Sequence, residues 1–582
     1  MSEAGGGRDA ADAFGTGEAE AGRGTGQGSG IGEVEVGGIG DGAADVGAPR
    51  VKPISEITSG FVLDPPVRLS ASRLWELQRG FYSREGLRAW GEGAVPYQIT
   101  CNPLIASGYA EVIVAFLRDC DAAGLLPRER RVHVLELGAG SGRFAHALLR
   151  RLRTLLAATS LRDLELTLVV SDFDAAKLQQ LAAHPHLQAD LADGWIDFAT
   201  VDIAAPGPVR TWRRGEVLGG APLVVVANYV FDSVPADAYA IRAGVVHEAR
   251  LGLLTDRLGL DLGAPGALDE LEFVWEVSPD PAPPSGNPQI DAVLARYAEV
   301  LDTTTVVMPM AAMACLERLA SDAGAPMLAL VADKGWPHLR DLSNLGAPSI
   351  VPHDGCFSLM VDFDAIARIV RAQCGTALLP PHRPQHLVVG AFVYGDLDVS
   401  ETAARFADAL AEGGPDDAFE VRAAMAPIDG QLTASQALSL LRTARWDTQV
   451  FLDLFPALLD LAPGVSGAGR ADLALAVRRV RDAWFPIGES ADVALCLGLL
   501  LSGIGHHREA LELFAVSSEV RGENANAYLG SAVAHHALRE LDQALKDVSD
   551  ALALEPQLDA ARALAVEIED ELGRDDGGVR PG

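Results

Sequence analysis

The sequence has little positive charge for its length. Of its 582 residues, 47 are lysine or arginine and 80 are aspartate or glutamate, so the formal net charge is −33. Nucleic acids and anionic membranes are bound through basic surfaces, and this balance argues against both as partners. Long apolar runs are also missing. Although 49% of the residues are hydrophobic, no run approaches the roughly 20 residues that a membrane-spanning helix needs.

Cysteine is scarce and scattered. The six cysteines include no C-x-x-C pair, which gives no support for a disulfide framework or a zinc site and favours a reducing compartment. The pairs His506–His507 and His535–His536 do not indicate a metal site either, because adjacent residues on a helix point about 100° apart. The first residues lack the basic start and apolar stretch of a signal peptide. We therefore expect a cytoplasmic protein without a bound metal.

Changes in composition along the chain predict its domains. Residues 1–50 hold 16 of the 60 glycines, and such a segment is expected to be a disordered leader because it cannot bury enough apolar surface. An α/β domain is expected over 53–400, with helices at its N-terminal end and an insertion near 238–320. Beyond it we expect a helical connector over 401–490 and a helical repeat over 491–575.

Strand and helix patterns alternate from Arg131 onward. The expected strands are Val132–Leu137, Leu164–Val170, Trp195–Thr200, Ala221–Ala227, Met327–Ala332 and Leu387–Tyr394. Amphipathic helices are expected between them, for example over 142–157 and 175–182. This alternation predicts a Rossmann-like α/β fold with a mostly parallel sheet and helices on both faces. Upstream helices are expected over 67–90 and 108–126, extra strands over 238–276, and a loop over Pro279–Pro288.

A 34-residue period appears in the C-terminal helices. Matching positions carry Gly498 and Ala532, Ala510 and Ala544, and Phe514 and Val548. Small interior residues followed by a bulky one at this period are typical of tetratricopeptide repeats. Two units and a final helix form a short array, which should need packing against the connector helices for its stability. Such repeats present concave faces to peptides or helices, so a protein partner or protein substrate is expected.

The clearest motif is HVLELGAGSGRF, residues 133–144. A predicted strand carries Glu136, and Gly138, Gly140 and Gly142 follow before a helix begins. Glycines at such a turn let the backbone approach a ligand closely. The dinucleotide fingerprint G-x-G-x-x-G is not matched, because Arg143 stands where its third glycine would be. The spacing fits an adenosyl ligand without pyrophosphate, and E-x-G-x-G-x-G resembles motif I of class I S-adenosyl-L-methionine (SAM) methyltransferases.

Polar residues follow the next predicted strands. Asp172 is expected to accept the ribose hydroxyls, while Asp174 is expected to cap the helix after it. Asp202 and Ile203, after the third strand, are predicted to meet the adenine amine and ring face.

The fourth strand ends in Asn228, Tyr229 and Asp232, at the carboxyl edge where open α/β sheets bind ligands. Asn228 and Asp232 are the predicted catalytic residues: Asp232 is expected to contact the acceptor, and Asn228 to contact the cofactor as well. Two structural alternatives stay open: Asp232 as a helix N-cap, and Asn228 as a strand terminus bonded to backbone.

Several stretches together resemble one family. They are YQITCNPLIASGYAEVI (97–113), ELGAGSGR (136–143), ANYVFDSVPADAY (227–239), VADKGWP (331–337) and HDGCFSLMVDFDAI (353–366). The pattern is similar to that of the MidA-like methyltransferases, the family that includes the mitochondrial complex I assembly-factor protein arginine methyltransferase. The resemblance spans roughly 95–395 and is closest to a bacterial subgroup fused to tetratricopeptide repeats.

The resemblance implies SAM as cofactor and a protein side chain as one class of acceptor. Thr100 and Asn102 would line the substrate pocket with Tyr229, and Asp362 would either face the crevice or cap a helix. Tyr229 stands where the family has glutamate, which leaves an arginine acceptor open. The alternative from another class is a non-catalytic scaffold whose repeat mediates protein–protein contacts.

Overall fold

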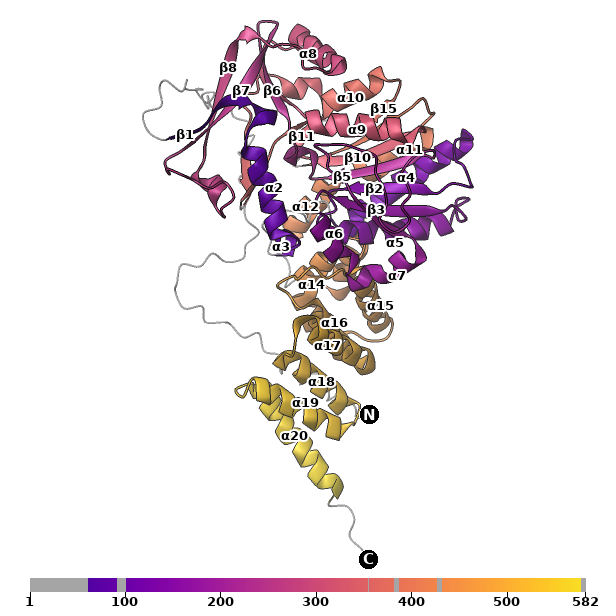
Figure 1. Ribbon diagram of the computed structural model, residues 1–582. Helices are drawn as coiled ribbons and strands as arrows, with labels where there is room; N and C mark the ends of the chain where they lie inside the picture. Colours follow the sequence, from indigo (N-terminus) through magenta and orange to yellow (C-terminus); the bar gives the residue numbers. More distant parts are fainter. Residues whose placement is uncertain (1–60, 92–100, 354, 382–386, 426–431, 577–582) are drawn as a thin grey trace, which may run out of the picture.

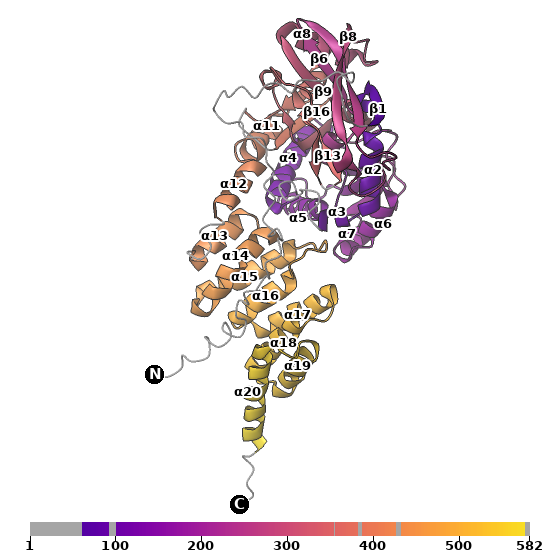
Figure 2. The same ribbon diagram turned by 90° about the vertical axis from the view of Figure 1, so that its left-hand side faces the viewer.

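The computed structural model describes residues 61–91, 101–353, 355–381, 387–425 and 432–576 (Figure 1). The leader predicted over 1–50 lies outside these residues. The described part consists of a strand-rich region with two large sheets and a column of helices that extends away from it to the C-terminal end (Figures 1 and 2). Among the described helices, none has the length and apolar character required to cross a bilayer.

The central sheet has seven strands in the order β15-β16-β10-β5-β2-β3-β4. They are β2 (Val132–Leu137), β3 (Leu166–Asp172), β4 (Ile196–Thr200), β5 (Leu223–Asn228), β10 (Met327–Asp333), β15 (Thr376–Leu378) and β16 (Val388–Tyr394). The strands from β10 to β4 pair in parallel, whereas β16 is antiparallel to both β10 and β15. The chain runs outward from β2 in one direction through β3 and β4, and returns to its other side with β5. Ligands bind at such a reversal in open α/β sheets.

Helices cover both faces of this sheet. Alternate residues of a buried strand point to opposite faces. In β2, Val134 belongs to one apolar core and Leu135 to the other. The first core contains α4 (Pro103–Ala122), α5 (Arg143–Ala157) and α6 (Ala175–Ala182), and the second contains α8 (Pro288–Val300), α9 (Met310–Ala323) and α10 (Phe363–Ala372). The six predicted strands and the helices between them are thereby confirmed within a few residues.

A second sheet is antiparallel throughout. It contains β1 (Phe61–Arg68), β6 (Asp237–Arg242), β7 (Val245–Thr255), β8 (Glu272–Pro281) and β9 (Thr303–Met308). Most of it comes from the predicted extra strands over 238–276. The loop predicted from Pro279 is wrong at its start, because β8 continues to Pro281, which pairs with His247 of β7.

The helix predicted over 67–90 is wrong at its N-terminal end and divided. Residues 67 and 68 complete β1, and α2 (Leu74–Glu85) is separated from α3 (Arg88–Gly91). The separation occurs at Gly86, whose φ of +55° is a conformation that few other residues adopt. The next helix, α4, begins at Pro103 rather than 108, because Asn102 caps it there.

Helices alone follow β16 within the described residues. They are α11 (Ser400–Phe406), α12 (Pro415–Met425), α13 (Ala434–Thr443), α14 (Thr448–Leu461), α15 (Ala468–Ala483), α16 (Val493–Gly503), α17 (His507–Arg521), α18 (Ala525–Ala537), α19 (Leu541–Leu554) and α20 (Asp559–Asp576). The 34-residue period matches the helix pairs α16–α17 and α18–α19. Gly498 is small for a packing reason, because a Cβ there would lie 2.6 Å from the Phe514 ring.

Candidate cofactor site

The glycine-rich turn joins β2 to α5 as the sequence predicts. Gly138, Gly140 and Gly142 have φ values of +65°, +54° and +81°, a left-handed conformation that costs other residues about 1–2 kcal/mol each. Gly142 is the residue that precedes the first turn of α5. The turn therefore needs glycine for its backbone conformation at all three positions.

Side chains from distant segments enclose the turn. A Cβ on Gly138 would lie 2.7 Å from Val230, which follows β5, and a Cβ on Gly142 would lie 3.0 Å from Leu181 of α6. On Gly140 it would lie 3.2 Å from the indole of Trp90 in α3. The helices α2 and α3 thus reach the carboxyl edge of the central sheet and form part of the site.

Two buried acids lie beside the turn. Glu136 is 5% exposed, and its pKa is raised to about 8 by burial and by Asp172, while Lys177 opposes the shift. Asp172 ends β3 and forms an ion pair with Lys177 of α6, and each of these two side chains is 3% exposed. Lys177 was not among the predicted site residues, although its position on the helix that follows Asp172 could have indicated it.

The other predicted residues after β3 and β4 have distinct roles. Asp174 caps α6 as expected, accepting hydrogen bonds from the backbone N–H groups of Ala176 at 2.8 Å and Lys177 at 3.3 Å. Asp202 lies 3.0 Å from Nη1 of Arg79, which α2 contributes. Ile203 is buried next to Asp202. The structure therefore brings Asp202 to the same edge as the glycine turn and pairs it with α2.

The residues predicted to contact the methyl acceptor lie at the end of β5. Asn228 is its last residue, and its Oδ1 accepts a hydrogen bond from the Tyr109 hydroxyl of α4 at 2.9 Å. Tyr229 has a φ of +52°, a strained conformation for a residue of this size. Burial and the nearby Asp232 raise the pKa of Tyr229 above its usual range. Tyr109 is a further site residue that the sequence analysis did not single out.

Asp232 is paired with a second acid, Asp333 at the end of β10. The two side chains are 3% and 0% exposed. Asp232 accepts from the Ser233 hydroxyl at 2.7 Å, and Asp333 accepts from the backbone N–H of Phe231 at 3.1 Å. Burial raises the pKa of Asp232 to about 6 and, together with Asp232, raises that of Asp333 well above its usual range. The interpretation of Asp232 as an N-cap is wrong, because it lies inside the short helix Phe231–Ser233.

Of three further predicted residues, two cap helices and one lies outside the described residues. Asn102 caps α4, its Oδ1 accepting from the N–H groups of Leu104 and Ile105, each at 3.0 Å. Thr100 lies outside the described residues. Asp362 caps α10, accepting from the N–H of Ala365 at 2.8 Å, which confirms the capping alternative.

The buried polar atoms around the turn fit a SAM cofactor. Glu136 Oε2 and Asn228 Nδ2 are buried without a hydrogen-bond partner, and buried polar groups normally have one. SAM offers an ammonium group, ribose hydroxyls and an adenine amine as donors, and a carboxylate as acceptor. Glu136, Asp172 and Asp202 supply acceptors for the first set, while Asn228 Nδ2 and the helix N-terminus at Gly142 supply donors for the second.

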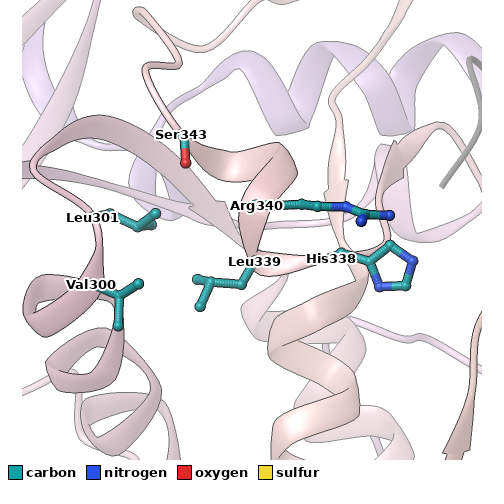
Figure 3. Close-up of a pocket in the computed structure, with 6 residues that line it drawn as sticks. All are labelled: Val300, Leu301, His338, Leu339, Arg340 and Ser343. Carbon is teal, nitrogen blue, oxygen red and sulfur yellow. The ribbon is translucent and has the colours of Figure 1, made fainter.

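Two other features lie apart from this site. A hollow of about 600 Å³ lies between the end of α8 and residues 338–343 (Figure 3). Its lining residues are Val300, Leu301, His338, Leu339, Arg340 and Ser343, and none of them belongs to the predicted site.

In the C-terminal helices, His536, Glu567 and Glu571 have ligand atoms within 4.8 Å of one another. Arg539 already forms an ion pair with Glu571 there.

Comparison with known proteins finds one family model that matches the central part of the chain. Residues 110–382 match the model of a family described as "Putative S-adenosyl-L-methionine-dependent methyltransferase". Among curated proteins, no relative matches the chain. In agreement with this match, the chain is an enzyme, a SAM-dependent methyltransferase, and its cofactor is SAM.

Solved structures are similar at low identity. An uncharacterized superfamily protein from Burkholderia thailandensis is 17% identical with a TM-score of 0.35, over 58% of this chain and 90% of its own. A second member from that organism, bound to S-adenosyl-homocysteine, is 18% identical with a TM-score of 0.35, over 57% of this chain and 90% of its own. The CMeT domain of the citrinin polyketide synthase is 9% identical with a TM-score of 0.23, over 49% of this chain and 51% of its own. At these TM-scores the likeness is weak and carries no argument about this chain.

Proposed function

We propose that the chain methylates a protein side chain, or a substrate bound to a partner, that the C-terminal helices recruit. The observation that carries the proposal is the placement of Glu136, Asp172 and Asn228 around a left-handed glycine turn, where the strand order reverses. Open α/β sheets bind their ligands there. The helix pairs α16–α17 and α18–α19, with α20, would form the tetratricopeptide-type repeat that recruits the partner.

The residues at the turn would hold the cofactor. Gly138, Gly140 and Gly142 would let the backbone lie close to it. Asp172 would accept hydrogen bonds from the ribose hydroxyls while it also pairs with Lys177. Asp202 and Ile203 would meet the adenine. SAM supplies a methyl group that is already activated by its sulfonium, so the protein contributes chiefly alignment and exclusion of water.

The Asp232–Asp333 pair would handle the acceptor's proton. When a nucleophile X–H attacks the methyl carbon, the C–S bond breaks and its electron pair stays on sulfur. The proton on X must then go to a base. Two adjacent buried carboxylates do not both ionise readily, so the pair holds one proton and can accept a second. Asn228 and Tyr229 would position the nucleophile.

Arginine remains one candidate acceptor within this proposal. A guanidinium is held best by two parallel hydrogen bonds to carboxylate oxygens. Tyr229 replaces the glutamate that the resemblance would place beside Asn228, but Asp232 and Asp333 supply two neighbouring carboxyl groups.

A labelling experiment tests the proposal. The wild-type chain is incubated with methyl-tritiated SAM and peptides that each offer one nucleophilic side chain, including arginine, lysine, histidine and glutamate. Label on peptide from wild type, lost in Asp232→Asn, supports the assignment. SAM binding without label on any peptide, together with peptide binding to the C-terminal helices, favours the alternative of a non-catalytic scaffold.

A further inference from the structure

A short segment of the helical region packs against the glycine-rich turn. It comprises Trp484–Glu489 and connects α15 to α16. Arg143, which follows Gly142, forms an ion pair with Glu489 in which the two side chains are 16% and 15% exposed. Arg143 Nη2 also donates to the carbonyl of Phe485 at 3.3 Å. The first residue of α5 is thus held by the helical region at two points.

Aromatic packing also brings the same segment into contact with the turn. The Phe485 ring is 1% exposed, and its Cζ would lie 3.6 Å from a Cβ on Gly142. It stacks on His184 with ring centroids 3.9 Å apart at an angle of 16°. His184 Nε2 lies 2.9 Å from the carbonyl of Pro486. The position of Gly142 is therefore set in part by a ring that the C-terminal helices provide.

The segment also reaches the other side of the turn. Ile487 packs on a small apolar cluster that includes Phe81 and Trp90, and the Trp90 indole is the group that lies against Gly140. A shift of the segment would move the neighbours of Gly140 and Gly142 together, because packed interiors transmit displacement.

The far end of the segment is fixed by the first helix pair of the repeat. Arg521, the last residue of α17, donates to the carbonyl of Ser490 at 2.6 Å and also to that of Glu489. Asp492 caps α16 and accepts from the Ser517 hydroxyl of α17 at 2.6 Å. Figures 1 and 2 show the helices from α12 to α20 as one column that leads away from the sheets. A continuous set of contacts thus joins α16 and α17 to the turn.

We propose that Trp484–Glu489 is a positioning segment for the cofactor turn, through which α16 and α17 set the affinity of the site for SAM. The inference rests on the proposed function, since it requires SAM at the glycine turn. Coupling between two sites is reciprocal. A ligand on α16 and α17 that shifts the segment changes SAM affinity, and SAM in turn orders the segment.

SAM titration of matched variants tests the proposal. Glu489→Gln and Phe485→Leu should each bind SAM about tenfold more weakly than wild type, a typical magnitude for coupled sites. The double variant Arg143→Gln/Glu489→Gln should bind no more weakly than the worse single variant, because both changes break one ion pair. Arg539→Gln is the control, since it breaks the Arg539–Glu571 pair beside α20, outside α16 and α17, and should bind SAM as wild type does.

A second readout separates positioning from general stability. Amide hydrogen exchange in residues 484–503 of the full chain should slow on saturation with SAM in wild type and change less in Glu489→Gln. Wild-type SAM affinity in both Glu489→Gln and Phe485→Leu, with only a lower melting temperature, would overturn the positioning role while leaving the cofactor site intact. Failure of the wild type itself to bind SAM would overturn the proposed function and this inference together.

Discussion

The indole of Trp90 lies against Gly140, so that a Cβ on this glycine would be 3.2 Å from the ring. The same ring faces the ammonium group of Lys177 at 4.6 Å, a favourable contact between a cation and an aromatic face. Lys177 in turn forms the ion pair with Asp172. One aromatic side chain from α3 therefore connects the glycine turn with the acid after β3, and it ties the upstream helices to the cofactor site.

Gly140→Val should abolish SAM binding while the fold persists. A β-branched residue is strained at a φ of +54° and meets Trp90. The control is Gly464→Val, where an added Cβ meets nothing within 4 Å. Calorimetric titration of SAM, with circular dichroism to verify folding, measures the difference. Undiminished binding in a folded Gly140→Val would remove the turn from the cofactor site.

Glu136→Gln should flatten the dependence of stability on pH. The pKa of Glu136 is about 8 when folded and about 4.5 when unfolded. A carboxyl group whose pKa is raised by folding contributes stability that is complete below pH 4.5. This stability is lost as the pH rises to 8, at about 1.4 kcal/mol per pH unit. Urea unfolding midpoints between pH 5 and 9 should fall less steeply in the variant. Equal slopes would mean that Glu136 ionises normally.

Asp232→Asn should spare SAM binding and slow methyl transfer about 100-fold or more, the usual contribution of a general base. In wild type the rate should rise as pH passes through about 6, because the base must be ionised and the pKa of Asp232 lies there. The rate of a substrate found in the labelling experiment, followed from pH 5 to 8, provides the measurement. Turnover that is unchanged in the variant would exclude Asp232 from the chemistry.

Three histidines, His146, His184 and His186, pack around the Phe485 ring, and this junction between the two regions should weaken in mild acid. Burial and nearby cationic groups, Arg150 first, lower the pKa of His146 from 6.5 to about 3, and burial lowers those of His184 and His186 in the same direction. The unfolded chain takes up protons that the folded chain excludes. Stability is therefore complete above pH 6.5 and is lost below it, by about 1.4 kcal/mol per pH unit for His146.

His146→Gln tests this expectation directly. Its melting temperature should drop less than that of wild type between pH 7.5 and 5.5, as followed by calorimetry. His247→Gln serves as the control, since His247 lies on β7 away from the junction. A drop of the same size in all three proteins would show that the junction histidines do not titrate with folding.

Local patterns account for what the sequence predicted correctly. The strand Val132–Leu137, the glycines after it and the cap at Asp174 depend on residues within a few positions of one another, so periodicity and turn chemistry identify them. The placement of Asp172, Asp202 and Asn228 at one sheet edge follows from parallel strands ending together.

Tertiary packing supplies the rest. Trp90 meets Gly140 across 50 positions of sequence, and Arg79 reaches Asp202 across 123. Nothing local marks either pair, because both depend on how α2 and α3 cross the sheet edge. Asp333 was not predicted as a site residue for a similar reason. It is the last residue of β10, more than a hundred residues after Asp232, the acid with which it pairs.

Direct titration of SAM into the purified chain tests the central claim, that the turn after β2 binds this cofactor. Calorimetry with SAM, S-adenosyl-homocysteine and NADH, on wild type and on Gly140→Val, is sufficient. Binding of both adenosyl ligands to wild type, with none of NADH and none to the variant, is the predicted result. Binding of no adenosyl ligand by folded wild-type protein would contradict the account and direct attention to the partners of the C-terminal helices.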